Sequence, residues 1–568
     1  MASTPHISRR DALKLGALGS AAFLLPFERR ARTELGPTGT RIAASKLPKP
    51  YTLPFQKPPV LQPVYRDAKT DYYRIWQRQE SVQIIPGYLT PIYGYNGMTP
   101  GPTIVAERGR ECVVQQINAL PDSNVKFGKY KPWTSTHLHG SASLPEYDGY
   151  ASDVTQPGQW KNYRYPNIQD ARTLWYHDHG VHHTAENAYM GLAAMYILHD
   201  ESERRLDIPR GDYDVPLILK DAMFDTTGAL LFDDHSESGM YGDVNLVNGV
   251  PWPVMRVERR KYRFRVLNAC ISRSFRLRLS TGEPITIIGT DGGLMPAPQS
   301  VANFRCGMAE RYEIVIDFSK YPIGQRVLLQ NVSPPNNIDE VHTAKVMAFD
   351  VVGEPSTLEG NSIPAVLNTN QEVMGLTTAQ SVRRRELVFE RDQADPTKPE
   401  QWTINGTTWE DVIDSDYKFC LASPAKDSVE VWRLTNKSSG WFHPVHIHLV
   451  DFKVLSRSGK QPFAWEKGPK DVVYVGENES VDVIMRFTNQ VGRYMIHCHN
   501  LVHEDHDMMG QFEVGSGGHD PIYADPAREI PAPSFDPPPA PEPSVTPEPS
   551  PTPDASATPD SGSSPSGV

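Results

Sequence analysis

The segment His497-Cys498-His499, which opens the run HCHNLVHEDHDMMG, combines residue types that bind soft transition metals. His503 follows Cys498 by five residues, and Met508 follows His503 by five more. Two imidazoles, one thiolate and a weakly held thioether form the ligand set of a blue-copper electron-transfer centre. Cys498, His503 and Met508 supply three of these ligands, so a second histidine must come from elsewhere in the chain.

The two histidines beside Cys498 suit a different site. In a strand, residues i and i+2 share one face, and the residue between them points to the opposite face. His497 and His499 can therefore bind a second metal site on the side opposite the sulfur. One strand would then connect two metal sites, which indicates an enzyme and not a simple copper carrier.

Three other clusters of histidines complete the set. They are His137-Leu138-His139, His177-Asp178-His179, and the run from His443 to His448 that reads HPVHIH. Ten of the 18 histidines lie in the four clusters. A single His-x-His pair is more often a solvated strand face, but four clusters, one with Cys and Met at ligand spacing, predict metal binding.

Four segments resemble the copper motifs of the multicopper oxidase family. Within that family the chain looks most similar to bilirubin oxidases and to the bacterial spore-coat type of laccase, over roughly Leu53 to Val514. The segments are HLHGSASLPEYDGY, LWYHDHGVHHTAENAYMGLAAMY, GWFHPVHIHLVDFKV and HCHNLVHEDHDMMG.

The resemblance implies copper as the cofactor, with one type 1 ion, one type 2 ion and a type 3 pair. Every ligand position of the family pattern is filled in this chain, and the axial residue is a methionine. The implied type 1 ligands are His443, Cys498, His503 and axial Met508; the type 2 ligands are His137 and His446; the type 3 ligands are His139, His177, His179, His448, His497 and His499.

The resemblance also implies the reaction. A small-molecule reductant (bilirubin, a phenol or an aromatic amine) gives up electrons one at a time at the type 1 copper. The electrons pass through Cys498 to the neighbouring histidines, and the three-copper cluster reduces O₂ to water in a four-electron step. The cofactor performs the redox chemistry, and the protein sets the ligand geometry and the proton supply.

Three further residues coincide with functional positions of the family. Glu504 and Asp148 match acidic residues beside the cluster and are suited to move protons. Trp441 matches a tryptophan that bilirubin oxidases hold beside the blue copper. Outside the family context, each carboxylate could be a surface or turn residue, and Trp441 could be an ordinary buried aromatic.

Other reductants and other classes of protein stay open as alternatives. A broad-specificity laccase would share the copper ligands, and so would a metallo-oxidase that acts on Cu(I) or Mn(II). The 15 methionines form no Met-rich run, which disfavours Cu(I) as the substrate. A copper-storage or electron-transfer protein would need only the Cys498 set, and a nitrite reductase of related fold would lack the type 3 pair.

An internal repeat indicates the fold. Asn96-Gly97, Asn248-Gly249 and Asn405-Gly406 each open a similar run of turn and alternating strand. Short runs of Val, Ile and Tyr broken by Gly and Pro recur throughout, which predicts an all-β chain of three cupredoxin-like Greek-key β-sandwiches. We expect them at residues 46–204, 205–370 and 371–515. Because copper motifs occur only in the first and third, the cluster should lie at their interface, with the middle domain as a spacer.

Both ends of the chain differ from this body. Ser8-Arg9-Arg10-Asp11 precedes a weak apolar run and resembles a twin-arginine export signal, so residues 1–45 are predicted to be a signal and linker of an exported, secreted or cell-envelope protein. Proline fills 13 of the last 38 residues, which predicts a disordered tail at 516–568.

The remaining composition excludes some partners and leaves others open. A net charge of −11 argues against binding to nucleic acid. The apolar run of the signal is too short and too weak to span a membrane permanently, and no other stretch approaches a transmembrane helix. We expect a monomer. One or two disulfides could form among Cys112, Cys270, Cys306 and Cys420, with the pairing undetermined.

Replacing Cys498 by serine should abolish the intense blue absorption and the uptake of O₂ while it leaves the fold intact. The substitution removes the thiolate that defines a blue-copper site. Absorption spectroscopy and an oxygen electrode measure both effects. A variant that turns over at the normal rate would contradict the scheme.

Overall fold

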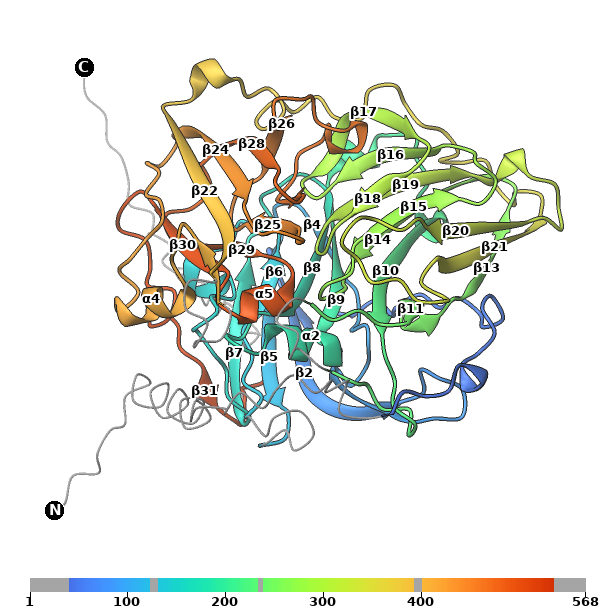
Figure 1. Ribbon diagram of the computed structural model, residues 1–568, viewed down its shortest axis with the longest axis horizontal. Helices are drawn as coiled ribbons and strands as arrows, with labels where there is room; N and C mark the ends of the chain where they lie inside the picture. Colours follow the sequence, from blue (N-terminus) through green and yellow to red (C-terminus); the bar gives the residue numbers. More distant parts are fainter. Residues whose placement is uncertain (1–39, 123–130, 233–238, 393–400, 536–568) are drawn as a thin grey trace, which may run out of the picture.

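The computed structural model describes residues 40–122, 131–232, 239–392 and 401–535. It places three β-sandwich domains around a common centre, with domain 3 (yellow to red) and domain 2 (green) side by side and domain 1 (blue to cyan) beneath them in Figure 1. In the described residues each domain has two sheets. The predicted all-β fold of three consecutive sandwiches is confirmed.

Domain 1 carries two of the predicted metal-binding segments on its smaller sheet. The larger sheet has the order β1 (Tyr65–Arg66), β2 (Thr70–Val82), β5 (Glu111–Ala119), β7 (Gln159–Tyr165) and β31 (Arg528–Glu529), with β3 (Thr90–Tyr95) paired to β2. The smaller sheet has the order β4 (Ile104–Glu107), β9 (Ala193–His199), β8 (Arg172–Asp178) and β6 (Thr136–His139).

Domain 2 carries none of the histidine clusters. Its first sheet has the order β12 (Val250–Pro251), β11 (Val244–Val247), β10 (Asp214–Ala222), β14 (Lys261–Asn268), β19 (Arg311–Asp317), β16 (Ile285–Thr290) and β17 (Gly293–Val301). Its second sheet has the order β13 (Val254–Glu258), β21 (Lys345–Gly353), β20 (Arg326–Asn331), β15 (Phe275–Leu279) and β18 (Phe304–Cys306).

Domain 3 carries the other two metal-binding segments, again on its smaller sheet. The larger sheet has the order β23 (Gln401–Ile404), β22 (Arg383–Asp392), β24 (Val429–Asn436), β28 (Ser480–Arg486) and β26 (Phe452–Arg457). The smaller sheet has the order β27 (Val472–Val475), β25 (His443–Ile447), β29 (Gly492–Cys498) and β30 (Met509–Val514).

The described helices are short and lie between strands. The α-helices are α2 (Thr184–Met190), α3 (Glu201–Arg204), α4 (Trp409–Asp414) and α5 (Leu501–Asp505). The 3₁₀ turns are η1 (Ala44–Lys46), η2 (Pro145–Tyr147), η3 (Gly211–Tyr213), η4 (Phe318–Lys320), η5 (Thr378–Gln380) and η6 (Ala464–Glu466). None of the helices in the described ranges is long and apolar enough to cross a bilayer.

The three domains share the repeat that the Asn-Gly pairs predicted. Each contains an equivalent pair of parallel strands: β2 with β5, β10 with β14, and β22 with β24. Both residues of each Asn-Gly pair have positive φ, which these residue types tolerate in a tight turn. The side-chain oxygen of each asparagine accepts a hydrogen bond from a strand amide: Asn96 from Trp76 (2.9 Å), Asn248 from Ile218 (2.8 Å) and Asn405 from Val388 (2.7 Å).

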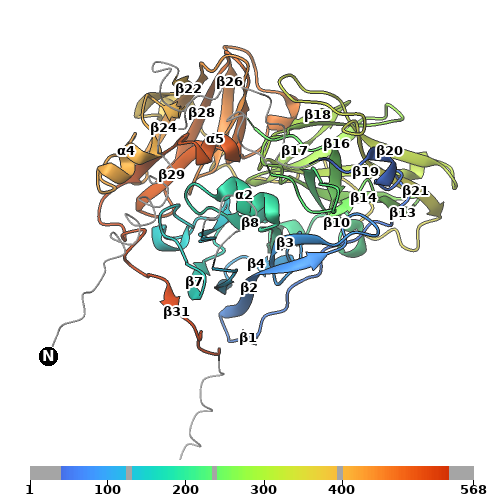
Figure 2. The same ribbon diagram turned by 60° about the horizontal axis from the view of Figure 1, so that its bottom comes forward.

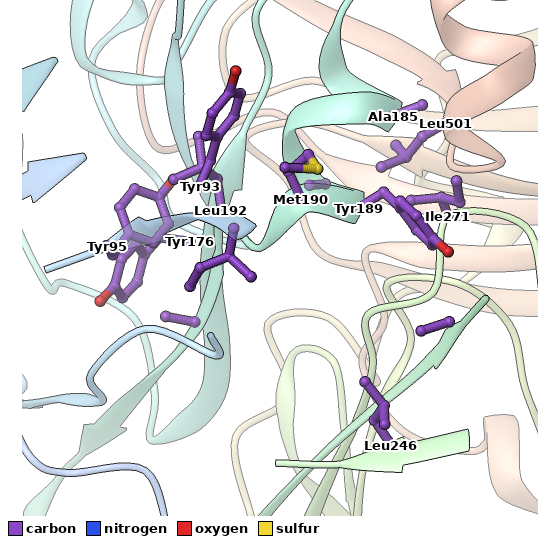
Figure 3. Packing of buried hydrophobic residues seen from close by; sticks show 14 of the residues in the cluster. Tyr93, Tyr95, Tyr176, Ala185, Tyr189, Met190, Leu192, Leu246, Ile271 and Leu501 are labelled. Carbon is purple, nitrogen blue, oxygen red and sulfur yellow. The ribbon is translucent and has the colours of Figure 1, made fainter. Parts of the chain in front are cut away.

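One apolar core continues from domain 1 into both other domains. Tyr189 and Ala185 of α2, Leu246 of β11, Ile271 of domain 2 and Leu501 of α5 belong to the same buried cluster. Figure 3 shows Ala185 beside Leu501, with Tyr189 directed towards Ile271. The amide of Leu501 also donates to the carbonyl of Ile271 (2.9 Å). Helix α5, which carries two predicted functional residues, is thus fixed by all three domains.

A buried ion-pair network joins domain 2 to strand β8 of domain 1. The Arg265 guanidinium is fully buried, lies 2.8 Å from Asp214 and 2.9 Å from Glu313, and donates to the Thr173 hydroxyl (3.0 Å). Removing one partner of such a network leaves an unpaired buried charge and costs about 3–5 kcal/mol. The network therefore fixes β8 against domain 2.

Residues 516–535 correct the predicted tail. Strand β31 pairs antiparallel with β7, at the edge of the domain 1 sheet (Figure 2). The Trp160 indole donates to the Glu529 carbonyl (3.0 Å), and Ile522 is buried. The prediction of disorder from 516 is wrong here because the proline-rich composition begins only at Pro531, and the residues before it include side chains that can pack. Residues 536–568 of that tail and the predicted export signal lie outside the described residues.

The cysteines left open by the sequence form no disulfide in the described residues. Cys112, Cys270 and Cys306 are buried free thiols, and Cys420 is a partly exposed one. Burial raises the pKa of Cys112 to about 11, which keeps this thiol protonated and unreactive at neutral pH.

Ending the chain at Gly515 should lower its thermal stability, because the truncation removes β31 and exposes the surface that Ile522 covers. Burying a side chain of this size is worth about 1.5–3 kcal/mol. A chain that ends at Phe535 keeps these contacts and is the matched control. Calorimetry measures both midpoints, and equal midpoints would show that the segment does not stabilise domain 1.

Candidate metal centre

The pairing of strands β25 and β29 positions the candidate ligands of domain 3. They pair antiparallel, with His446 opposite His497 and Val445 opposite Cys498. Cys498 ends β29, and the short helix α5 begins three residues later. Because neighbouring residues of a strand face opposite ways, the Cys498 thiol lies on one face of the sheet and the imidazoles of His446 and His497 lie on the other.

On the face with the thiol, His443, Cys498 and His503 come together. Nδ1 of His443 lies 3.3 Å from the Cys498 sulfur, Nδ1 of His503 lies 3.6 Å from it, and the two nitrogens are 3.2 Å apart. All three residues are fully buried. Met508 is buried in the same core, and its carbonyl accepts a hydrogen bond from the Cys498 amide (3.1 Å). The four residues predicted as type 1 ligands are thus neighbours.

The outer nitrogens of the two imidazoles also have polar neighbours. Nε2 of His443 lies 2.9 Å from the Ser438 hydroxyl, and Nε2 of His503 lies 3.0 Å from the Asn500 side-chain amide. The Asn500 backbone amide donates to the Cys498 sulfur (3.3 Å). Such contacts fix the ring orientation and stabilise a thiolate, as partners of metal ligands do.

Two tryptophans contact this group. Trp441, singled out from the sequence, is partly exposed and lies edge-on to His503, with ring centroids 5.4 Å apart. Trp402 is fully buried and stacks on His503 at 3.8 Å, with an interplanar angle of 20°. The two indoles meet edge to face at 6.1 Å. Sequence reasoning missed Trp402 because no local spacing connects it to a ligand.

Behind the thiol, eight histidines from domains 1 and 3 converge. Their ligand atoms form three groups, within each of which all atoms lie within 4.8 Å of one another. The groups are His139 with His177 and His499, His179 with His448 and His497, and His137 with His446 and His448. The six predicted type 3 ligands fall into the first two groups, and the predicted type 2 pair falls into the third. Which ion each group binds stays a prediction.

Domain 1 supplies its four imidazoles from β6, β8 and the residue after β8. These two strands pair antiparallel with His137 opposite His177. The His-x-His spacing directs His137 and His139 to one face of β6. The cluster lies between domains 1 and 3, because each of its three groups contains residues of both domains.

Three of the histidines each leave one ring nitrogen free to bind a metal. Nδ1 of His137, His177 and His446 is held by the backbone carbonyls of Asp148, Asp178 (2.7 Å) and Asp471 (2.8 Å) respectively. Nε2 of the same three histidines is buried without a hydrogen-bond partner in the described residues. A metal ligand needs one bare nitrogen and a second nitrogen held by a donor–acceptor contact. Imidazoles with one thiolate are the donor set that copper prefers.

Burial favours the neutral form of three of these imidazoles. It lowers the pKa of His177 and of His443 to about 3 and that of His179 to about 4, so their lone pairs are available at neutral pH. Burial raises the pKa of the Cys498 thiol well above its usual range. Copper must therefore displace the thiol proton when it binds.

Both predicted carboxylates lie beside the cluster. Asp148 Oδ2 lies 2.7 Å from Nδ1 of His448, and burial raises the pKa of this carboxyl well above its usual range. Glu504, on α5, lies 2.9 Å from Nδ1 of His497 and 3.5 Å from Nδ1 of His179. Burial raises the pKa of Glu504, but the attraction of these two imidazoles outweighs it and lowers the pKa to about 2.

Sequence reasoning also missed Asp471 and Arg311. Asp471 lies between β26 and β27, and its carboxylate is 3.1 Å from Nε2 of His139. Arg311 of domain 2 lies 2.5 Å from the same carboxylate. Neither residue belongs to a histidine cluster, so no motif pointed to them.

Comparisons with known proteins agree with this geometry. Three family models, each described as multicopper oxidase, match residues 78–203, 215–351 and 391–518. The bilirubin oxidase of Albifimbria verrucaria is 39% identical over an alignment of 508 positions that covers 84% of each chain. A laccase of Bacillus subtilis (strain 168) is 31% identical over 510 residues, 80% of this chain and 97% of that one. The crystal structure of a multi-copper oxidase from Pediococcus acidilactici superposes with a TM-score of 0.71 at 28% identity, covering 83% and 92% of the two chains.

Replacing Trp402 by alanine should lower the reduction potential of the blue site, because the indole excludes water from the His503 face and a wetter site favours oxidised copper. The cavity should also lower the free energy of unfolding by about 3–5 kcal/mol. Redox titration of the blue absorption measures the potential. Trp441→Ala, which removes only an edge contact, is the control, and equal potentials in the two variants would contradict the role of stacking.

Proposed function

Because the chain belongs to the multicopper oxidase family, we propose that it couples one-electron oxidation of an organic substrate to the four-electron reduction of O₂ to water. One ion would be held by His443, Cys498 and His503 with Met508, and three by the eight histidines behind them. The observation that carries the proposal is that β29 and the residue after it contribute to both groups. When bound, copper supplies the one-electron redox steps and the reduction of dioxygen.

The protein provides a short path between the two groups. Cys498 is covalently joined to His497 and His499, which lie in different imidazole groups. Nδ1 of His497 also lies 3.1 Å from the Cys498 carbonyl oxygen, which adds a hydrogen-bonded link to the covalent one. The backbone therefore connects the thiolate to both type 3 groups without an intervening side chain.

Protons for the formation of water would come from opposite sides of the cluster. Asp148 contacts His448, and Glu504 contacts His497 and His179. Each carboxyl group is buried and within hydrogen-bonding range of a ligand imidazole, the geometry required of a group that delivers or accepts protons.

The substrate passes its electrons through side chains. The imidazoles of His443 and His503 are fully buried, so a reductant cannot touch them directly. Trp441 is partly exposed and contacts both Trp402 and His503, and this aromatic path suits an organic reductant with conjugated rings. We take bilirubin as the first candidate, since the relative at 39% identity is a bilirubin oxidase, and phenols as the second, since relatives at about 31% are laccases.

We also propose that the chain is exported by a twin-arginine-type pathway and acts as a monomer. The support for export is Arg9-Arg10 before the apolar run that ends at Leu25. That route carries folded proteins, which suits a site assembled from distant segments.

Oxygen uptake by the copper-loaded protein tests the function. Bilirubin, a dimethoxyphenol and Mn(II) are compared at matched concentrations, with hydrogen peroxide assayed in parallel. We expect the fastest uptake with bilirubin and no peroxide, because reduction of O₂ by four electrons ends at water. Preference for the phenol would make the chain a laccase, preference for Mn(II) a metallo-oxidase, and no uptake with any of them would overturn the proposal.

A further inference from the structure

We infer that Arg311 and Asp471 form a clamp that selects which nitrogen of His139 faces the three-copper cluster. The middle domain, which supplies none of the predicted copper ligands, would then control copper binding there. The inference rests on the proposed function, because it concerns copper held by the eight histidines.

Asp471 contacts imidazoles of two domains at once. Its Oδ1 lies 3.1 Å from Nε2 of His139 in domain 1 and 3.9 Å from Nδ1 of His446 in domain 3. Its backbone carbonyl accepts the hydrogen bond from Nδ1 of His446 (2.8 Å). One residue thus orients one predicted type 3 ligand and one predicted type 2 ligand.

His139 presents a different nitrogen from His137, His177 and His446. Its Nδ1 is buried without a hydrogen-bond partner in the described residues, whereas Nε2 is the unpaired atom of His137, His177 and His446. A carboxylate beside Nε2 accepts a hydrogen bond from the Nε2–H group. The proton of the neutral ring then stays on Nε2, and Nδ1 is left bare. Asp471 therefore determines the tautomer of His139.

Arg311 holds Asp471 rigidly. The side chain is fully buried, and its Nη1 and Nη2 donate to Oδ1 (2.7 Å) and Oδ2 (2.5 Å) of Asp471 as a two-pronged pair. The remaining N–H groups donate to the carbonyls of Thr173 (3.0 Å), Ala309 (3.0 Å) and Asp291 (3.1 Å). All five donors of the guanidinium are therefore occupied, and Asp471 cannot turn away from His139 without breaking this set.

The residue after His139 leaves room for the clamp. Gly140 has φ +89°, and a Cβ at this position would lie 2.7 Å from both Arg311 Nη2 and Asp471 Oδ2. Any side chain would push the guanidinium and the carboxylate away from the cluster. Only glycine accommodates both the backbone conformation and this approach.

If Arg311 only stabilised the fold, replacing another buried arginine of domain 2 should weaken copper binding equally. Arg265 provides this comparison. Both arginines are fully buried in domain 2, and both donate to Thr173 of β8. Arg265 pairs with Asp214, Glu313 and Glu203 and, within the described residues, makes no hydrogen bond or ion pair with Asp471 or an imidazole. Arg265→Lys is therefore the matched control for Arg311→Lys, since lysine keeps the charge and loses the two-pronged contact.

The test compares copper binding by full-length wild type, Arg311→Lys, Asp471→Asn and Arg265→Lys. Each copper-depleted protein is titrated with copper, and the blue absorption, the type 2 electron paramagnetic resonance signal and the copper bound per chain are measured. We expect Arg311→Lys and Asp471→Asn to bind type 2 and type 3 copper about 10–100-fold more weakly, as loss of a partner of a ligand does. The blue absorption, which reports a folded domain 3, should persist, and Arg265→Lys should load like wild type.

Three outcomes overturn the clamp: wild-type loading in both Arg311→Lys and Asp471→Asn, equal loss in Arg265→Lys, or loss of the blue absorption together with the type 2 signal. If Arg311→Lys fails to fold, Asp471→Asn tests the clamp instead, since this substitution keeps the volume of the side chain. A wild-type protein that shows neither signal would instead overturn the proposed function, so the two failures are distinguishable.

Discussion

An imidazole that binds a metal has a second nitrogen, and the whole centre depends on how the protein holds it. Here the carbonyls of Asp148, Asp178 and Asp471 hold Nδ1 of three histidines, so backbone segments and not only side chains orient the ligands. Backbone position is set by strand pairing, and each sheet must therefore be in register before the bare nitrogens can converge. The pairing of strands within the β-sandwiches therefore determines how the ligands are oriented.

The parts that could be predicted from the sequence are those that depend on local periodicity. A His-x-His pair places both imidazoles on one face of a strand, and His137 and His139 of β6 behave in this way. The Asn-Gly turns marked the threefold repeat because a tight turn with positive φ restricts the residue types that can form it. The position of Glu504 was expected from the resemblance to the family and not from periodicity, and its carboxylate lies 2.9 Å from Nδ1 of His497.

The parts that could not be predicted depend on contacts between distant segments. His139 and Asp471 are 332 positions apart, and Arg311 comes from a domain without a metal motif. No spacing rule connects them, and the description of the middle domain as a spacer was incomplete for the same reason. The stacking of Trp402 and the pairing of β31 could not be predicted either, because both depend on contacts with segments that are distant in the sequence.

The return of the chain to domain 1 at β31 has a consequence for biosynthesis. A ribosome releases β6 and β8 early, whereas β25, β29 and α5 emerge near the end and β31 later still. A nascent chain thus displays the four imidazoles of domain 1 before those of domain 3 exist, and the complete donor set is present only once the chain has been made as far as Met508. Copper that arrives before domain 3 has folded against domain 1 meets only half of the imidazoles of the cluster, so the complete donor set is available only after the two domains have joined.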